Sequence, residues 1–376
     1  MKMPAAAIRE EISKCGAISF ARFMELALYC PETGYYETKK DNIGGDGDFI
    51  TSVSTGSLFG ELLAFQFAEW LTELSVADPG HGGGFASASS RWAIVEAGSH
   101  DGRLAGDILA WLEANRPDLF QQIEYVIVET SARRRDWQKE NLRMFAPRVR
   151  WLPGLQASAR RELNGVVFCN ELLDAFPVRR FGWDAAKRQW FEWGVGLAGE
   201  KFDWRRLESP VLDMAQVCPP ELERVLPDNY VMEASPAAEN WWRQAAGLLA
   251  QGKLLAIDYG YSAEEMISPA RTGGTLRAYR RHQVTHDLLA DPGGQDLTAH
   301  VNFTALRKAG ESAGLLTEAL CPQPQFLTRI FQRAITTQCF ARMDPKRLRQ
   351  FHTLTHPEHL GRAFRVLVQS ASWACG

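Results

Sequence analysis

One stretch of the sequence restricts the possible folds more than any other. Residues 92–102 read Trp-Ala-Ile-Val-Glu-Ala-Gly-Ser-His-Asp-Gly, so a short apolar run ends at Glu96, glycines follow at 98 and 102, and a helix pattern begins. This order predicts a strand that turns into a helix, with backbone free of Cβ atoms where a nucleotide-like cofactor can approach. The dinucleotide fingerprint Gly-x-Gly-x-x-Gly is absent, so the spacing favours S-adenosylmethionine over a dinucleotide.

Strand and helix patterns alternate along the chain after this turn. Short apolar strand patterns are found at 92–97, 124–129, 149–152, 165–169 and 253–258, and helix patterns at 103–114, 131–144 and 303–313. Such alternation is typical of a parallel sheet with helices on both faces. We therefore expect an α/β, Rossmann-like core with a mostly parallel sheet.

The predicted organisation has three parts. Residues 1–90 form an N-terminal helical cap with a Gly-Asp-Phe loop and a linker, residues 91–335 form the core, and residues 336–376 form a helical tail. An insertion at about 178–238 contains runs that alternate as antiparallel strands do, and it can form a wall or lid over a substrate. A long loop is expected at 259–302.

Composition excludes several classes of protein. The chain has 376 residues and a formal net charge of −3, with no long run of Lys and Arg, so a nucleic-acid surface is not expected. No apolar run approaches the roughly 20 residues of a membrane span. The seven cysteines are dispersed without a Cys-x-x-Cys pair, and the first residues do not resemble a signal peptide. We expect a cytoplasmic protein with reduced thiols.

Glu129 follows the second strand pattern, 31 positions after Gly98. An acid at this place can accept hydrogen bonds from ribose hydroxyls. The alternative is an ordinary solvated acid at the end of a strand. The neighbouring Thr130, together with Ser99 and Gly102 of the glycine turn, is also expected beside the cofactor.

Residues 169–177, Cys-Asn-Glu-Leu-Leu-Asp-Ala-Phe-Pro, follow the fourth strand pattern. Asn170 is expected at the cofactor, whereas Glu171 and Asp174 share a face if a helix begins here. Two carboxylates could then hold a guanidinium in a forked pair and act in catalysis. The alternative is a pair of acids favoured by a helix N-terminus.

Two other segments supply candidate contacts. In residues 47–52, Gly-Asp-Phe-Ile-Thr-Ser, Phe49 could cover the cofactor and Thr51 could bind its amino-acid end, unless the segment is only a capped turn. The candidates for acceptor binding come from residues 258–300. They are Asp258, Tyr261, Arg277 and His300.

Several patterns receive a structural interpretation. Consecutive side chains diverge, so the adjacent Ser99, His100 and Asp101 cannot form a nucleophilic triad. The histidines at 352, 356 and 359 are interpreted as a helix end rather than a metal site. Residues 133–135, Arg-Arg-Arg, are interpreted as a solvated helix face.

Taken together, the motifs resemble those of the MidA-type methyltransferases, which include the mitochondrial complex I assembly-factor arginine methyltransferases. The resemblance runs from about residue 8 to 335. Its carriers are residues 31–36, 47–52, 59–62, 96–98, 104–109, 170–177, 258–260 and 296–298. It implies a class I methyltransferase fold, S-adenosylmethionine as donor and protein arginine as the best-known acceptor.

The chain departs from the family pattern at three places. Ser99 and His100 stand where relatives usually carry Pro-Gly, and a Cβ at position 100 crowds a place where backbone often approaches the cofactor. Residues 53–54 are Val-Ser in place of Pro-Glu, and Asn302 replaces an acid. The expected function is methylation of arginine in a protein. The alternatives are O- or N-methylation of a small molecule, and a non-catalytic assembly factor with a degenerate donor site.

Overall fold

A computed structural model gives the structure of the protein. It describes residues 3–38, 51–77, 91–155, 161–207, 212–280, 283–285, 287–340, 344–361 and 363–371. The predicted loop at 44–50 and the predicted linker at 78–90 lie outside these residues.

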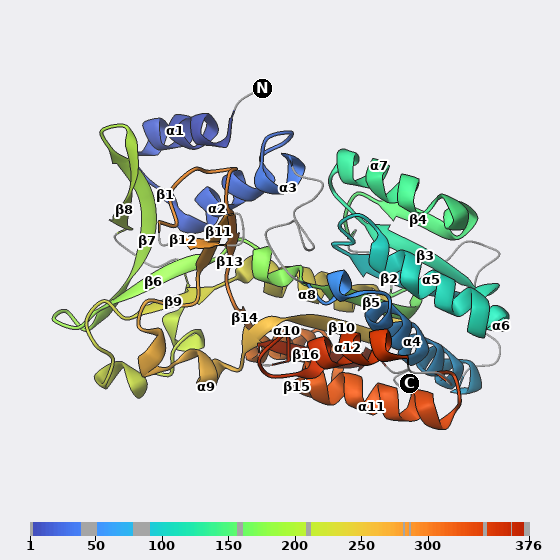
Figure 1. Cartoon of the computed structure of the whole chain (residues 1–376). Coiled ribbons are helices and arrows are strands. Elements are labelled where there is room, and N and C mark those ends of the chain that lie inside the picture. Colours follow the sequence, from blue (N-terminus) through green and yellow to red (C-terminus); the bar gives the residue numbers. More distant parts are fainter. Residues whose placement is uncertain are drawn as a thin grey trace.

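An eight-stranded sheet forms the centre of the core (Figure 1). Seven strands follow the order β15-β16-β10-β5-β2-β3-β4, and β14 pairs with the end of β10. Their bounds are β2 Trp92–Ala97, β3 Ile123–Val128, β4 Val149–Leu152, β5 Leu163–Asn170, β10 Leu249–Tyr261, β14 Val301–Asn302, β15 Leu316–Pro322 and β16 Phe364–Ala371. Only β16 runs antiparallel to its neighbours, so the predicted parallel sheet is confirmed.

Helices cover both faces of this sheet. One face packs against α4 Leu58–Ala77, α5 Arg103–Asn115, α11 Gln323–Thr336 and α12 Pro345–Thr355, and the other against α8 Pro236–Leu248 and α10 Phe303–Ser312. Adjacent residues alternate between the two cores, as Ile94 and Val95 do. This double burial explains why the strands read as continuous apolar runs. The remaining core helices are α6 Pro117–Phe120 and α7 Ala132–Asn141.

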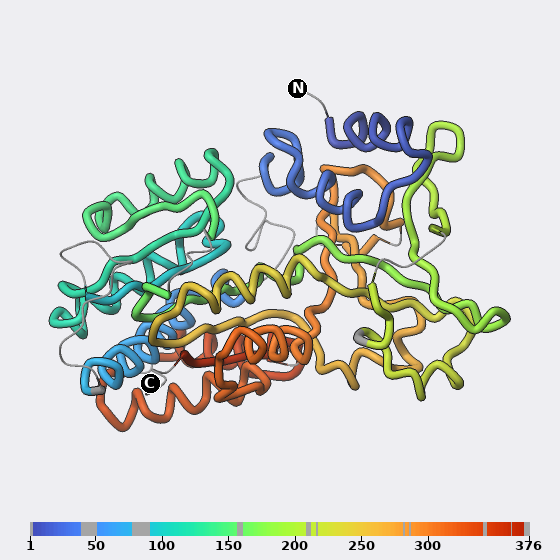
Figure 2. Tube along the Cα trace, turned by 180° about the vertical axis from the view of Figure 1, so that it is seen from behind, coloured from blue at the N-terminus to red at the C-terminus, as the bar shows by residue number. Residues whose placement is uncertain are grey.

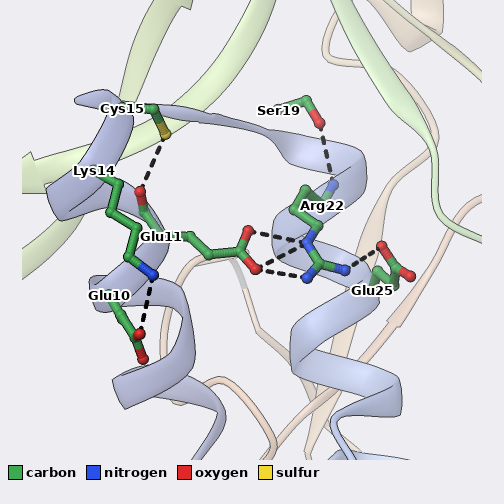
Figure 3. Close-up of polar contacts among 7 residues, drawn as sticks. All are labelled: Glu10, Glu11, Lys14, Cys15, Ser19, Arg22 and Glu25. Atoms are coloured by element: carbon green, nitrogen blue, oxygen red, sulfur yellow. Dashed lines mark hydrogen bonds and ion pairs between the residues drawn. The ribbon is translucent and has the colours of Figure 1, made fainter.

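An N-terminal cap, defined here as residues 3–38, contains α1 Pro4–Cys15, α2 Phe20–Tyr29 and α3 Tyr35–Thr38. Ser19 caps α2 by accepting a hydrogen bond from the Arg22 backbone N–H. The Arg22 guanidinium donates to Glu11 of α1 at 3.0 and 2.6 Å and to Glu25 at 2.8 Å (Figure 3). This forked ion pair joins α1 to α2.

The predicted insertion forms a five-stranded antiparallel sheet. Its strands are β6 Arg179–Asp184, β7 Gln189–Ala198, β8 Lys201–Leu207 and β9 Val231–Ala234, joined by β1 Ile18–Ser19 of the cap. The expected antiparallel pairing is confirmed, with Trp183 opposite Trp190. Figure 2 shows the cap helices beside the insertion strands, away from the core sheet.

Two expectations about secondary structure are wrong. The segment expected as a long loop contains a three-stranded sheet of β11 Arg277–Arg280, β12 Gln283–Thr285 and β13 Asp296–Thr298, besides α9 Ala263–Met266. The tail expected to be helical contains α12, but it also contains β16, which lies between β15 and β10. β16 is buried along nearly its whole length, yet its sequence, Phe-Arg-Val-Leu-Val-Gln-Ser-Ala, has only three consecutive apolar residues between polar ones, so it shows neither a long apolar run nor alternation.

Short 3-10 turns complete the described chain. They are η1 Val53–Thr55, η2 Arg143–Arg148, η3 Leu173–Ala175, η4 Met214–Gln216, η5 Leu222–Arg224 and η6 Pro269–Arg271. In the described ranges, no helix has both the length and the apolarity needed to cross a bilayer.

The position of β16 predicts the effect of a core substitution. Leu367 is fully buried in this strand, so Leu367→Ala should lower the free energy of unfolding by about 2–5 kcal/mol. Leu316 of the neighbouring β15 is 63% exposed, so Leu316→Ala should change it by less than about 0.5 kcal/mol. Urea unfolding measures both. Equal small effects would contradict a central strand at 364–371.

Candidate active site

The strand order reverses beside β2, because the chain passes from β2 to β3 and β4 on one side and returns to β5 on the other. The connections at the carboxyl ends of β2 and β5 therefore diverge and leave a crevice. A cavity of about 410 Å³ lies there. This is the size of a site for a small ligand.

Residues from several parts of the chain line this cavity. They are Tyr29, Tyr35 and Tyr36 of the cap; Thr51, Val53 and Ser54; Glu96, Gly98, Ser99, His100, Asp101, Arg103 and Leu104 at and after the end of β2; Asn170, Glu171, Leu172, Asp174 and Ala175 at and after the end of β5; and Arg134, Tyr259, Tyr279, Asp296, Thr298, Ala299, His300 and Ala363. No residue of the insertion at 178–238 is among them. The prediction that the insertion forms a substrate wall is therefore wrong for this cavity, and Trp183 and Trp190 pack in a core of their own.

The glycine turn depends on backbone that other residues rarely adopt. Gly98 has φ +77°, and an added Cβ would lie 2.8 Å from Leu172 Cδ1. Gly102, with φ +85°, starts α5 but does not line the cavity. His100 also takes a left-handed conformation, with φ +47°, and its side chain reaches the cavity. The turn thus accommodates the residue that replaces the usual glycine.

Glu96 lies buried at the base of this turn. Its Oε2 accepts a hydrogen bond of 2.6 Å from the Tyr125 hydroxyl. Burial raises the pKa of Glu96 to about 7, and the hydrogen bond from Tyr125 opposes this rise. The carboxyl group can therefore exchange a proton near neutral pH when a charged ligand group approaches.

Three buried polar atoms of cavity-lining residues have no hydrogen-bond partner among the described residues. They are His100 Nε2, Arg134 Nη2 and Asn170 Oδ1. An unsatisfied buried polar group costs roughly 1–3 kcal/mol, so three around one cavity indicate a polar ligand. Donors and acceptors in this number, beside a turn without Cβ at Gly98, fit a nucleoside that carries an amino-acid end.

Glu171 begins the turn after β5 in a strained conformation, with φ +49°. Its backbone N–H donates to Ile257 O at 2.9 Å, and its Oε1 accepts from the Ser52 backbone N–H at 3.0 Å and from Asn170 Nδ2 at 3.2 Å. Burial raises the pKa of Glu171 to about 8. Strained backbone of this kind persists where the surrounding structure holds a side chain in one orientation.

Asp258 lies beneath this turn and does not line the cavity. Its Oδ2 accepts hydrogen bonds from the backbone N–H groups of Leu172, Leu173 and Asp174 at 3.1, 2.8 and 3.4 Å. The Asp258 carboxylate therefore binds backbone N–H groups of the turn. Because Asp258 does not line the cavity, the prediction that it contacts the acceptor is corrected. Asp258 positions the turn that carries Glu171 and Asp174.

Acidic and tyrosine side chains meet on one side of the cavity. Burial, reinforced by Asp258, Asp296 and Glu171, holds the pKa of Asp174 well above its usual range. The Tyr36 hydroxyl donates to Asp296 Oδ2 at 3.1 Å, and the Tyr29 hydroxyl donates to Ala175 O at 2.9 Å. Asp174 lies in η3 rather than in the expected helix, yet it lines the same cavity as Glu171.

The structure brings together part of the predicted donor site. Glu96, Gly98, Ser99, Asn170 and Thr51 line the cavity. Glu129 and Thr130 do not line the cavity. Glu129 accepts hydrogen bonds from Ser131 N at 2.9 Å and from Gln138 Nε2 at 3.2 Å, and Thr130 is exposed. Phe49 lies outside the described residues. The ribose contact of Glu129 stays a prediction.

The predicted acceptor residues are similarly divided. His300 lines the cavity, and burial lowers the pKa of its imidazole to about 4, so it is neutral near pH 7. Tyr261 stacks on the His300 ring at 4.9 Å between centroids but does not reach the cavity. Arg277 is exposed on β11 and is not in the lining. Tyr279, Asp296 and Thr298, which also line the cavity, belong to the sheet that the sequence did not predict.

Arg134 is the main cavity residue that the sequence analysis missed. It was interpreted as part of a solvated arginine run, yet its Nε donates to Tyr36 O at 2.9 Å and it lines the cavity. Its position two residues beyond the start of α7, close to Glu129, is the signal that could have identified it. Within the described ranges, no group of His, Cys, Asp and Glu could hold a metal ion.

Comparison with known proteins agrees with this geometry. A family described as S-adenosyl-L-methionine-dependent methyltransferase matches residues 62–320. The chain belongs to this methyltransferase family. A crystal structure of a COG1565 superfamily member from Burkholderia thailandensis, bound to S-adenosyl-homocysteine, has a TM-score of 0.82 and 32% identity, over 98% of this chain and 92% of that one.

The methyltransferase also has curated relatives. It is 28% identical to the protein arginine methyltransferase NDUFAF7 homolog, mitochondrial, of Drosophila melanogaster, over 96% of this chain and 83% of the relative. The Danio rerio protein arginine methyltransferase NDUFAF7, mitochondrial, is 27% identical over 95% and 84%. The class I fold, the enzymatic activity and S-adenosylmethionine as donor, all expected from the sequence, are confirmed.

The glycine turn predicts a selective loss of donor binding. Gly98→Ala should weaken S-adenosylhomocysteine binding at least about 10-fold, because the new Cβ meets Leu172 and φ is left-handed. Gly199→Ala is the matched control, since Gly199 has φ +61° but open space around its Cβ position. Titration calorimetry gives both affinities. Equal affinity in Gly98→Ala and the wild type would contradict this use of the turn.

The pKa of Glu171 predicts a pH-dependent stability difference. Between its ordinary pKa of 4.5 and the folded value of about 8, unfolding releases a proton, so rising pH removes stability from the wild type. Glu171→Gln lacks this titration. Its free energy of unfolding relative to wild type should rise from pH 5 to 8, by at most about 1.4 kcal/mol per pH unit.

Urea unfolding at each pH measures this difference. The exposed Glu264 has a lowered pKa, so Glu264→Gln should show no such trend above pH 5. A flat difference for Glu171→Gln as well would show that Glu171 is ionised in the folded protein throughout this range.

Proposed function

We propose that this methyltransferase methylates the guanidinium of arginine in a protein substrate. The observation that carries the proposal is the group of acids in the lining of the donor cavity: Glu171, which is partly buried, and Asp174 and Asp296, which are buried. Burial raises the pKa values of Glu171 and Asp174, and neighbouring acids raise that of Asp174 further, so a positive charge beside them would stabilise their ionised forms. A cationic planar acceptor would supply that charge and could form forked hydrogen bonds with a carboxylate.

The tyrosines of the cavity suit the same acceptor. The rings of Tyr29 and Tyr36 stack 5.5 Å apart, and both belong to the cap rather than to the core. Aromatic faces attract flat cations such as guanidinium. The acceptor side thus combines acids of the core with aromatic rings of the cap.

The chemistry requires positioning and the removal of one proton. When bound, S-adenosylmethionine supplies a methyl group activated by its sulfonium. Glu171 and Asp174 orient the acceptor nitrogen in line with that methyl group, which lowers the entropic part of the barrier. A nitrogen–carbon bond forms, the carbon–sulfur bond breaks, and Glu171 accepts the proton that the nitrogen loses. Its pKa of about 8 suits a group that takes up a proton near neutral pH.

The names of the relatives support a protein acceptor, since both are called protein arginine methyltransferases. The alternative, methylation of a small molecule, would use the insertion at 178–238 as a substrate wall, but this insertion does not line the cavity. That alternative therefore loses the feature that motivated it.

The acceptor is tested by mass spectrometry. The purified chain, incubated with isotope-labelled S-adenosylmethionine and a protein extract, should label protein that releases methylarginine on acid hydrolysis. Label confined to small molecules, or released as another methylated amino acid, would overturn the arginine proposal.

Carboxylate substitutions test the catalytic roles. Glu171→Gln and Asp174→Asn should each lower turnover by roughly 100-fold or more, because orientation and proton removal are lost. Calorimetry should show that S-adenosylhomocysteine still binds Glu171→Gln. A variant that keeps wild-type turnover would remove its residue from the mechanism, and Glu264→Gln is the control for a lost surface charge.

The cytoplasmic location stays a prediction. No disulfide joins any of the six cysteines of the described residues, which suits a reducing compartment.

A further inference from the structure

Arg134 connects the donor cavity to the N-terminal cap. Its Nε donates a 2.9 Å hydrogen bond to Tyr36 O, and its Cζ lies 5.0 Å from the centre of the Tyr36 ring. Its Nη2 is buried without a hydrogen-bond partner among the described residues, although Arg134 lines the cavity. The Arg134 guanidinium therefore binds the cap through Nε, and its Nη2 is available to donate a hydrogen bond to a ligand.

The residue that Arg134 holds also completes the acceptor side. The Tyr36 backbone carbonyl is bound by Arg134, while the Tyr36 hydroxyl donates to Asp296 Oδ2 at 3.1 Å. The Tyr36 ring lies against Tyr29, whose hydroxyl reaches Ala175 O in the turn of Asp174. A shift of the Arg134 guanidinium would therefore move groups on the acceptor side.

Two neighbours of Arg134 hold the cap without reaching the cavity. The Ser131 hydroxyl donates to Glu37 Oε2 at 2.8 Å, and Arg133 Nη1 donates to Glu37 O at 2.8 Å. Neither Ser131 nor Arg133 lines the cavity. The junction between α3 and α7 therefore contains contacts that hold the cap alone and one, Arg134, that can also sense a ligand.

We propose that Arg134 couples donor binding to completion of the acceptor side. Its free Nη2 donates to an anionic or polar group of the donor, for which the α-carboxylate has the matching charge. The guanidinium is then fixed, and it fixes Tyr36 and the α2–α3 segment. Because such coupling is reciprocal, the contact of Arg134 with Tyr36 also tightens donor binding. The coupling does not depend on which acceptor the enzyme uses.

Hydrogen exchange with and without S-adenosylhomocysteine tests the coupling. In the wild type, saturating S-adenosylhomocysteine should slow amide exchange in peptides covering residues 20–38 at least about 5-fold. In Arg134→Ala the affinity, measured by calorimetry, should fall about 10- to 100-fold, and the slowing should be absent even at saturation.

Two further variants separate coupling from support of the cap. Arg134→Lys keeps a positive charge but has one nitrogen, which cannot reach both Tyr36 O and the donor. It should recover part of the affinity and none of the slowing. Arg133→Ala should raise exchange of residues 20–38 in the free protein, yet keep wild-type affinity within about 2-fold and keep the slowing.

The outcomes decide between coupling and a purely structural clamp. Wild-type affinity in Arg134→Ala, or full ligand-dependent slowing in Arg134→Ala or Arg134→Lys, would overturn the proposal. So would loss of the slowing in Arg133→Ala with affinity unchanged, since any cap contact would then serve. If Arg134→Ala does not fold, Arg134→Lys and Arg133→Ala carry the same decision. Failure of the arginine acceptor would leave all these measurements unaffected.

Discussion

The active-site turn exists because Asp258 supplies acceptors for its backbone. The three N–H groups of Leu172, Leu173 and Asp174 converge on one carboxylate oxygen of the neighbouring strand, in a fully buried setting. Without that oxygen, three buried donors would lose their partners, each at a cost of roughly 1–3 kcal/mol. The left-handed backbone of Glu171 can persist only while this arrangement holds it. The positions of both candidate catalytic acids, Glu171 and Asp174, therefore depend on a buried residue that does not itself line the cavity.

The core could be predicted from the sequence because its pattern is repetitive. β2 is a short apolar run and α5 has one apolar face, so both were located to within a residue or two. The same reasoning failed for β16 and for β11–β13. β16 has only three consecutive apolar residues, and β11 and β13 are strands of three or four residues with mixed burial, so no period could be detected in them.

The site was predicted where strand ends determine it and missed where distant segments contribute. Ser99 and Asn170 lie at the ends of strands, and both line the cavity. Arg134 was misread because a run of three arginines shows no difference among its members until the cap covers one of them. The role of Asp258 was misread for a related reason. A sequence shows that a carboxylate stands at a strand end, but not which backbone groups turn toward it.

The place of β16 in the sheet has a consequence for how the chain folds during synthesis. β10 pairs with β16 rather than with β15. During synthesis, the edge of β10 that pairs with β16 therefore stays unpaired from the time Tyr261 is made until Phe364 is made. Long-range pairing of this kind is slow, and an unpaired apolar edge can associate with other chains. The helices and the donor turn can form early, whereas the last strand must insert between two others. A ribosome-bound chain that stops before this strand should therefore hold a nearly complete cofactor crevice on an unfinished sheet.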